Sequence, residues 1–295
     1  MKIRPTIFAM LLMGFGCFAS ATFGQQDDDV RGAFLTSRPK TENKSAPSSR
    51  PNRHRPKSTV AKPVGSPQPT TATNNAVVVS GPAKPLGRLG IGLTLFTRDA
   101  NGLTVRVDPS HEFHKGDRVR FLMETNADGF LYIFNTTDGG APVLIYPDPA
   151  LDEGGNFIQA HVPVELPSSV ATEERLKWLA FDEHAGAERL YLVFTREPLA
   201  TVPIDEDLVN YCRARETNCP LRPPAELWAQ IQKELAVPVQ VAKTQVYGRP
   251  QTVTEHDATT RGIGLSKSDP EPAVIMLTAS TASNMLVTTV DLIHK

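Results

Sequence analysis

From Gly90 onward the chain alternates apolar and polar residues in short runs that are separated by turn residues about every ten positions. The runs at 91–97 and 103–108 flank an Asn101-Gly102 pair, which is typical of a tight hairpin turn. Strands that alternate in this way bury one face and expose the other. The pattern therefore predicts a mainly β fold, specifically an antiparallel β-sandwich.

Residues 86–203 supply enough strands for one complete small domain. The run Phe-Leu-Tyr-Ile-Phe at 130–134 is apolar throughout, so we expect a central strand that is covered on both faces. Further strands are expected at 119–124, 143–146, 176–181 and 190–195. We assign this segment to the β-sandwich.

The segment that follows has helical rather than strand spacing. Residues 205–213 and 225–236 are expected to be helices, because Leu227, Ile231 and Leu235 recur at four-residue steps. We predict a helical insertion over 204–236 that is pinned to the sandwich by Trp228.

The last part of the chain returns to strand character after a stretch with little periodicity. We predict a mobile connection over 237–272 and a C-terminal β-hairpin over 273–295. Two strands alone are marginally stable in water. The hairpin is therefore expected to complete the sheet as edge strands.

The N-terminal residues have the three parts of a secretory signal. A basic Met-Lys-Ile-Arg start precedes an apolar run at 7–18 and a zone of small residues that contains Ala21 and Gly24. The run is shorter than the roughly 20 residues that span a bilayer, which makes retention as an anchor the lesser alternative. We predict a signal peptide over 1–24 and an exported protein of the periplasm, cell envelope or extracellular space.

Lipidation at Cys17 is a further alternative for the N-terminus. A lipoprotein cysteine usually follows a Leu-like residue three positions earlier, and here that position is Gly14. The motif therefore does not favour a lipid anchor.

Residues 25–85 consist mainly of Pro, Ser, Thr, Lys, Arg and Ala, a composition that cannot bury enough apolar surface to fold. We predict a disordered tether, whose removal should leave thermal stability nearly unchanged. Its charge is basic: residues 31–84 hold ten Lys or Arg and one acid (+9), whereas residues 85–295 hold nineteen Lys or Arg and twenty-eight acids (−9). We expect the tether to be a solvated linker, a peripheral contact to an anionic membrane or wall component, or an arm that folds back loosely on its own acidic domain.

Two cysteines remain once the signal segment is removed. Cys212 and Cys219 are close in sequence and, in an oxidising compartment, most simply form a local disulfide. A thiol redox pair would need the shorter Cys-x-x-Cys spacing. We predict a structural bridge.

Four motifs occur in a fixed order along the sandwich segment. They are a His-Lys-Gly-Asp turn within 113–121, Asp-Gly-Phe-Leu-Tyr-Ile-Phe-Asn at 128–135, Ile-Tyr-Pro at 145–147 and Glu-Arg-Leu-Tyr-Leu-Val-Phe-Thr at 188–195. This order resembles the bacterial family called domain of unknown function 4384 (DUF4384), over about residues 89–202. Phe130 stands where that family usually has Tyr.

The resemblance implies a β-sandwich accessory module of an exported or surface-associated protein. Members of that family have no agreed activity and no established catalytic residues, so none is carried over to this chain.

Several polar groups were weighed as metal or catalytic sites. His111 and His114 are three apart on a strand, which points their side chains to opposite faces instead of toward one ion. Asp182 and His184 lie in a charged turn that needs no function to explain it. His161, in an extended segment, is expected at the surface.

A calcium loop was also considered at Asp148, Asp152 and Glu153. These residues lack the alternating acids and central Gly of a known calcium loop. We therefore predict no metal, no cofactor and no catalytic residue.

The sequence contains no recognisable nucleophile elbow, dinucleotide-binding turn, zinc-protease helix or phosphate-binding loop. We expect an exported, envelope-associated, non-catalytic binding or accessory module with its contact surface at loops, notably 142–156. The alternatives are a metal-assisted hydrolase using His111, His114, Asp182 or His184, and a structural component of a surface assembly. The partner is an unknown protein or anionic envelope component, and nucleic acid is not expected because the segment 25–85 has one aromatic residue, Phe34, for stacking on bases.

The signal segment gives the first testable prediction. The mature protein should begin near Gln25, because small residues at Ala21 and Gly24 follow the apolar run. N-terminal sequencing of protein purified from the native cells checks this. A sequence that starts at Met1 would contradict it.

Overall fold

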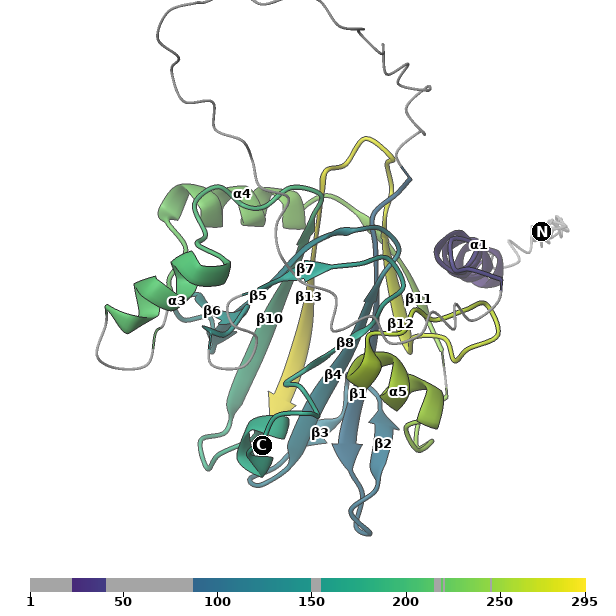
Figure 1. Ribbon diagram of the computed structural model, residues 1–295, viewed down its shortest axis with the longest axis horizontal. Helices are drawn as coiled ribbons and strands as arrows, with labels where there is room; N and C mark the ends of the chain where they lie inside the picture. The colour runs from purple at the N-terminus through teal and green to yellow at the C-terminus, as the bar shows by residue number, and fades with distance from the viewer. Residues whose placement is uncertain (1–22, 41–86, 150–154, 215–218, 220, 245) are drawn as a thin grey trace, which may run out of the picture.

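Two β-sheets stack face to face and enclose the main apolar core (Figure 1). The computed structural model describes residues 23–40, 87–149, 155–214, 219, 221–244 and 246–295. The predicted mainly β sandwich is confirmed, although helices cover the outer faces of both sheets. No helix within these described ranges is long and apolar enough to cross a membrane.

The first sheet, called sheet A here, has the strand order β11-β12-β1-β4-β8, with β2 also paired to β1 and β9 to β4. Its strands are β1 (Gly90–Arg98), β2 (Thr104–Val107), β4 (Arg118–Thr125), β8 (Val164–Leu166), β9 (Leu179–Ala180), β11 (Val239–Lys243) and β12 (Val274–Thr278).

The second sheet, sheet B, has the order β3-β13-β10-β5-β6, with β7 paired to β5. Its strands are β3 (Glu112–Phe113), β5 (Gly129–Thr137), β6 (Val143–Tyr146), β7 (Phe157–Ile158), β10 (Gly186–Thr195) and β13 (Met285–His294). A short 3-10 helix, η1 (Glu174–Lys177), precedes β9 where the sequence predicts a strand.

The alternation of side chains along β1 decides what each face of sheet A contacts. Ile91, Leu93 and Leu95 belong to the core between the sheets. The intervening positions, including Gly90 and Gly92, therefore face outward. This outer face of sheet A carries the features from which the candidate site is built.

The predicted helical insertion covers the outer face of sheet B. Helices α3 (Asp205–Arg213) and α4 (Ala225–Leu235) match their predicted spans. Trp228 of α4 lies edge-on to Phe134 and Tyr191, which confirms its expected contact with the sandwich. Cys212 at the end of α3 is bonded to Cys219, as the sequence predicts, with 4.9 Å between their Cα atoms.

The predicted C-terminal hairpin is wrong. β12 lies in sheet A between β11 and β1, and β13 lies in sheet B between β3 and β10, so the two strands cross from one sheet to the other. All five residues of β12 are buried. A run that is apolar on both faces needs an inner position in a covered sheet, which an edge hairpin does not provide.

The predicted mobile connection over 237–272 is also wrong, because it contains β11 and helix α5 (Val253–Arg261). Thr252 and Glu255 form a reciprocal capping box at the start of α5. Gly262 ends the helix with φ of 64°, a conformation that favours glycine. The Thr-x-x-Glu spacing was the sequence signal for this helix.

The predicted tether needs a correction at its N-terminal end. Residues Phe23–Leu35 form helix α1, which packs beside β11 and β12 on the outer face of sheet A (Figure 1). Val30 and Phe34, four residues apart on one helix face, are fully buried. Gly24 lies in the first turn of α1, whereas Ala21, most of the predicted signal peptide and residues 41–86 lie outside the described residues.

This packing reverses the expectation that residues 25–85 can be removed without loss. Deleting residues 25–40 should lower stability, because the buried Phe34 and Val30 each contribute roughly 1.5–3 kcal/mol. Each lost kcal/mol lowers the melting temperature of a domain of this size by about 2–4 °C. Circular dichroism melts check this. As the control, deleting residues 43–84 should leave the melting temperature within about 2 °C of wild type, and equal melts of the two deletions would contradict the docking of α1.

Candidate functional site

Sheet A is hollowed to receive the Phe34 ring. A Cβ atom added to Gly90 would lie 2.8 Å from Cδ2 of Phe34, and one added to Gly92 would lie 3.2 Å from its Cζ. Ile275 and Leu277 of β12 pack in the same cluster as Phe34. Two glycines at outward positions of one strand therefore leave the space that the ring occupies.

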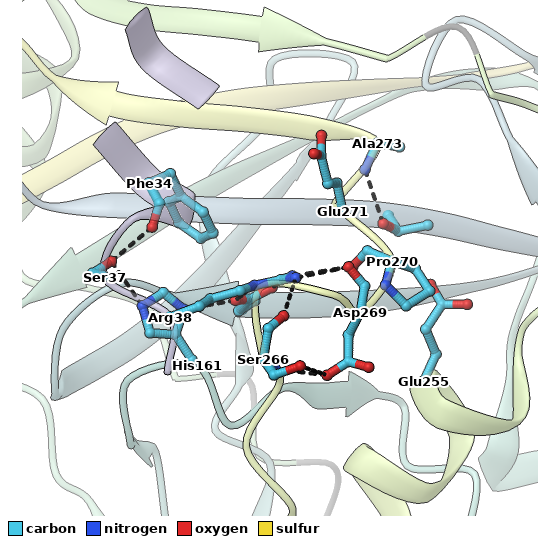
Figure 2. A network of polar contacts seen from close by, with 12 residues as sticks. Phe34, Ser37, Arg38, His161, Glu255, Ser266, Asp269, Pro270, Glu271 and Ala273 are labelled. Atoms are coloured by element: carbon cyan, nitrogen blue, oxygen red, sulfur yellow. Dashed lines mark hydrogen bonds and ion pairs between the residues drawn. The ribbon is translucent and has the colours of Figure 1, made fainter. Parts of the chain in front are cut away.

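Arg38, four residues after Phe34, is fully enclosed by acceptors. Its Nε and one terminal nitrogen donate to the two Glu124 carboxylate oxygens at 2.8 and 2.6 Å. The remaining bonds go to the backbone carbonyls of Ser266, Asp269 and Pro270, each at 3.1 Å (Figure 2). All five N–H groups of the guanidinium thus have an acceptor.

His161 connects this ion pair to the end of α1. Its Nδ1 lies 2.7 Å from Oε1 of Glu124, and its Nε2 lies 2.8 Å from Oγ of Ser37 (Figure 2). Its backbone has φ of 59°, in the left-handed region, and its N–H donates to the Thr125 carbonyl. The residue is 3% exposed, so the prediction of a surface histidine is wrong. Because a left-handed backbone is strained for a residue other than glycine, the contacts around His161 hold it in this conformation.

We call this arrangement the α1 dock. It consists of the residues that hold Phe34, Ser37 and Arg38, namely Gly90, Gly92, Glu124, His161, Ile275 and Leu277, with the carbonyls of Ser266, Asp269 and Pro270.

Ser37, His161 and Glu124 have the order and spacing of a Ser-His-acid catalytic triad. The Ser37 hydroxyl also donates to the Phe34 carbonyl at 2.6 Å, so it is bonded to the backbone of its own segment as well as lying 2.8 Å from Nε2 of His161. Together with the contact of 2.7 Å between Nδ1 and Glu124, these bonds hold the segment after α1 against sheet A.

The Glu124 carboxyl is held in its ionised form. Burial alone raises the pKa of Glu124, but hydrogen bonds from His161 and Arg38, together with the Arg38 charge, outweigh it and bring the pKa below its ordinary value. The dock therefore contains a buried carboxylate that is paired with the Arg38 guanidinium and hydrogen-bonded to His161.

The residues considered for a metal-assisted hydrolase lie elsewhere, at one end of the sandwich. Phe113 and Phe181 stack at 4.6 Å and so bring the segments of His111, His114, Asp182 and His184 together. All four of these residues are exposed, and His184 contacts Asp182 at 3.3 Å. Among the described residues there is no group of three or more His, Cys, Asp or Glu that could hold a metal ion. Asp148 is described, whereas Asp152 and Glu153 are not.

The sequence contains a helical spacing that indicates the segment bound in the dock, but the Pro- and Ser-rich composition of residues 25–85 as a whole hides it. Val30, Phe34 and Arg38 recur every four residues, which places them on one helix face and its continuation. This spacing lies in a stretch whose Pro and Ser content increases only after residue 38.

The dock predicts a particular dependence of stability on pH. Because the folded-state pKa of Glu124 is depressed, its contribution is fully present above the unfolded-state value near 4.3 and is lost as pH falls through the folded-state value. Glu124→Gln should lower the free energy of unfolding at pH 7 by about 3 kcal/mol or more, because it disrupts a buried ion pair. It should also flatten the loss of stability below about pH 4.3.

Urea unfolding between pH 7 and pH 3 measures both effects. Glu206→Gln changes an exposed residue of α3 and is the matched control, expected to follow wild type. A Glu124→Gln protein with wild-type acid dependence would contradict the role assigned to this carboxylate.

Comparison with known proteins places the central part of the chain in a family. A search of curated proteins and a search of solved structures each returned no match. A family model described as domain of unknown function (DUF4384) matches residues 112–198, a segment that runs from β3 to β10 and includes Glu124 and His161. Through this segment the chain carries a domain of the DUF4384 family, as the order of its sequence motifs predicts.

Proposed function

We propose that this protein is an exported, envelope-associated, non-catalytic binding module whose contact to the envelope is made by the basic segment 41–86. Seven Lys or Arg and one Glu give this segment a net charge of +6 (7 − 1). The ligand class is an anionic polymer or lipid surface that presents phosphate or carboxylate groups.

The observation that carries this proposal is that the folded domain holds the chain on both sides of the basic segment. On the N-terminal side, Arg38 is buried in the α1 dock. On the C-terminal side, Arg88 contacts Gln240 of β11 at 2.5 Å and Asp29 of α1 at 3.6 Å. Both connections to residues 41–86 therefore leave from the domain itself.

This arrangement changes what the segment can do. A tether separates a domain from its anchor only if the chain before it is free, and here that chain is α1, packed on sheet A. Because the domain holds both flanks of the basic segment, a surface that binds this segment also recruits the domain. We propose that the positive charges of this segment bind the envelope surface, and that the domain follows them to it.

The same geometry bears on the N-terminal alternatives. The apolar run ends at Phe18, and α1 begins at Phe23. If the signal segment is retained, only a few residues separate the membrane from the folded domain. Under that alternative the domain would lie against the membrane surface.

Two alternative functions follow from the sequence. A metal-assisted hydrolase and a structural component of a surface assembly are each favoured by no specific observation on the described residues. A metal analysis of the purified protein addresses the first, and cross-linking in intact cells addresses the second.

The proposed contact predicts binding to anionic surfaces. The mature chain should sediment with vesicles that contain 30% phosphatidylglycerol and not with neutral phosphatidylcholine vesicles, with binding that weakens as salt increases. Changing Arg50, Arg53, Arg55 and Lys57 to Gln should weaken binding more than about tenfold, since each basic residue near such a surface contributes about 1 kcal/mol.

A matched control changes four exposed basic residues of the folded domain to Gln: Lys115, Arg175, Arg213 and Lys233. Soluble polyphosphate, added as a competitor, separates recognition of a polyanion from a requirement for a lipid surface. The assignment to segment 41–86 would be rejected if the two quadruple variants lost binding equally. It would also be rejected if the mature chain bound neither the phosphatidylglycerol vesicles nor polyphosphate.

A further inference from the structure

The α1 dock has the properties of a peptide-recognition site that is filled by part of its own chain. Its two subsites are the hollow over Gly90 and Gly92, which receives an aromatic ring, and the ring of acceptors around Arg38. Both are supplied by sheet A and the segment before β12, and neither is supplied by α1. A helix that offers anchors to preformed pockets is a general mode of peptide recognition.

The arginine subsite discriminates by geometry as well as by charge. Glu124 accepts two parallel bonds from one edge of the guanidinium, and three backbone carbonyls accept the rest. A lysine ammonium has three donors on one atom and cannot satisfy five acceptors spread around a plane. The subsite is therefore specific for arginine.

The aromatic subsite fixes the spacing between the two anchors. Phe34 lies in the last turn of α1 and Arg38 lies three residues past the end of the helix, and both side chains are buried on the outer face of sheet A. Ser37 adds a contact to His161 between them. The ligand that fits is a helix with an aromatic residue in its last turn, followed past the end of the helix by a small hydroxyl residue and an arginine, the arginine four positions after the aromatic residue.

The long connection 41–86 between the dock ligand and β1 makes an exchange of this ligand topologically simple. Residues 23–40 do not pair with any strand, so their departure leaves the hydrogen bonding of both sheets intact. Attachment to the same chain gives the segment an effective concentration on the order of millimolar, which favours its own site over a free competitor.

We propose that the α1 dock also binds residues 26–40 of a second copy of this chain, by exchange with the segment attached to it. The partner is identified by its chemistry, because this segment carries the anchor pair that the two subsites fit. The inference rests on the structure of the dock and does not depend on the proposed envelope contact.

The experiment uses full-length mature chains in which the attached ligand is weakened. The Arg38→Ala chain keeps the dock but loses the arginine anchor, so a fluorescent peptide of residues 26–40 should bind it in trans. Isolated helices of this length are marginal in water, so binding is followed by fluorescence anisotropy up to millimolar protein. The wild-type chain should bind the peptide at least about tenfold more weakly than the Arg38→Ala chain does, because its own segment competes for the dock.

Peptide variants test the two subsites. Arg38→Lys and Phe34→Ala peptides should bind the Arg38→Ala chain about tenfold more weakly or worse. The matched control peptide carries Lys40→Arg, an exchange of the same two residue types at an exposed position of the same segment. This control should bind like the wild-type peptide.

A milder chain variant keeps the test decisive if Arg38→Ala prevents folding. The Arg38→Lys chain should retain a native near-ultraviolet spectrum. It should bind the wild-type peptide more tightly than the Arg38→Lys and Phe34→Ala peptides, as the Arg38→Ala chain does. Failure of the wild-type peptide to bind any folded Arg38 variant, or equal binding of the Arg38→Lys and wild-type peptides, would overturn the proposal.

Exchange between whole molecules is measured by mixing two variants. The Arg38→Ala chain offers an intact dock, and the Glu124→Gln chain offers an intact ligand with a defective dock of its own. Their mixture should form a heterodimer by analytical ultracentrifugation, while each variant alone sediments as a monomer. A mixture that stays monomeric, while the peptide binds, would overturn the assignment of the partner as a second copy.

Discussion

The burial of one arginine determines how the N-terminal part of this molecule is organised. Moving a guanidinium and a carboxylate out of water costs several kcal/mol per ion, and only complete hydrogen bonding offsets that cost. Arg38 has this complete set, with its charge paired to Glu124 and its other N–H groups on backbone carbonyls. Through these bonds Arg38 joins the end of α1 to the segment before β12 and, by way of Glu124, to His161 with its left-handed backbone.

The outer face of sheet A carries two further buried ion pairs. Arg106 of β2 pairs with Glu255 of α5, and Arg120 of β4 pairs with Glu165 of β8, all of them nearly buried. An apolar face can be covered by many segments in many registers. A buried charge, in contrast, requires an opposite charge at one particular position. Buried ion pairs contribute little net stability. Here the pairs of Arg38 and Arg106 each join sheet A to a segment that covers it, the end of α1 and α5 respectively.

The sequence predicted the strands of the sandwich well because alternation is a local signal. Residues 130–134 and 190–195 were placed correctly, since their apolar runs are read without knowledge of the rest of the chain. The distribution of strands between sheets is not a local property, so two consecutive strand patterns predict a hairpin although β12 and β13 belong to different sheets. The candidate site was missed for a related reason. Its members, Arg38, Glu124 and His161, are far apart in sequence, and no single one of them is unusual.

The limits of the family segment, residues 112–198, do not coincide with the limits of the folded unit. Within sheet A this segment supplies β4, β8 and β9, but β1, which pairs with β4 over seven residues, lies before it. Within sheet B it supplies β3, β5, β6, β7 and β10, but β13, which pairs with β10 over ten residues, lies near the C-terminus. A segment that lacks both partners would expose two long strand edges and the apolar faces they border. Glu124 and His161 lie inside the family segment, whereas Arg38 lies outside it, so the carboxylate and the histidine find their cation only when the whole chain is present.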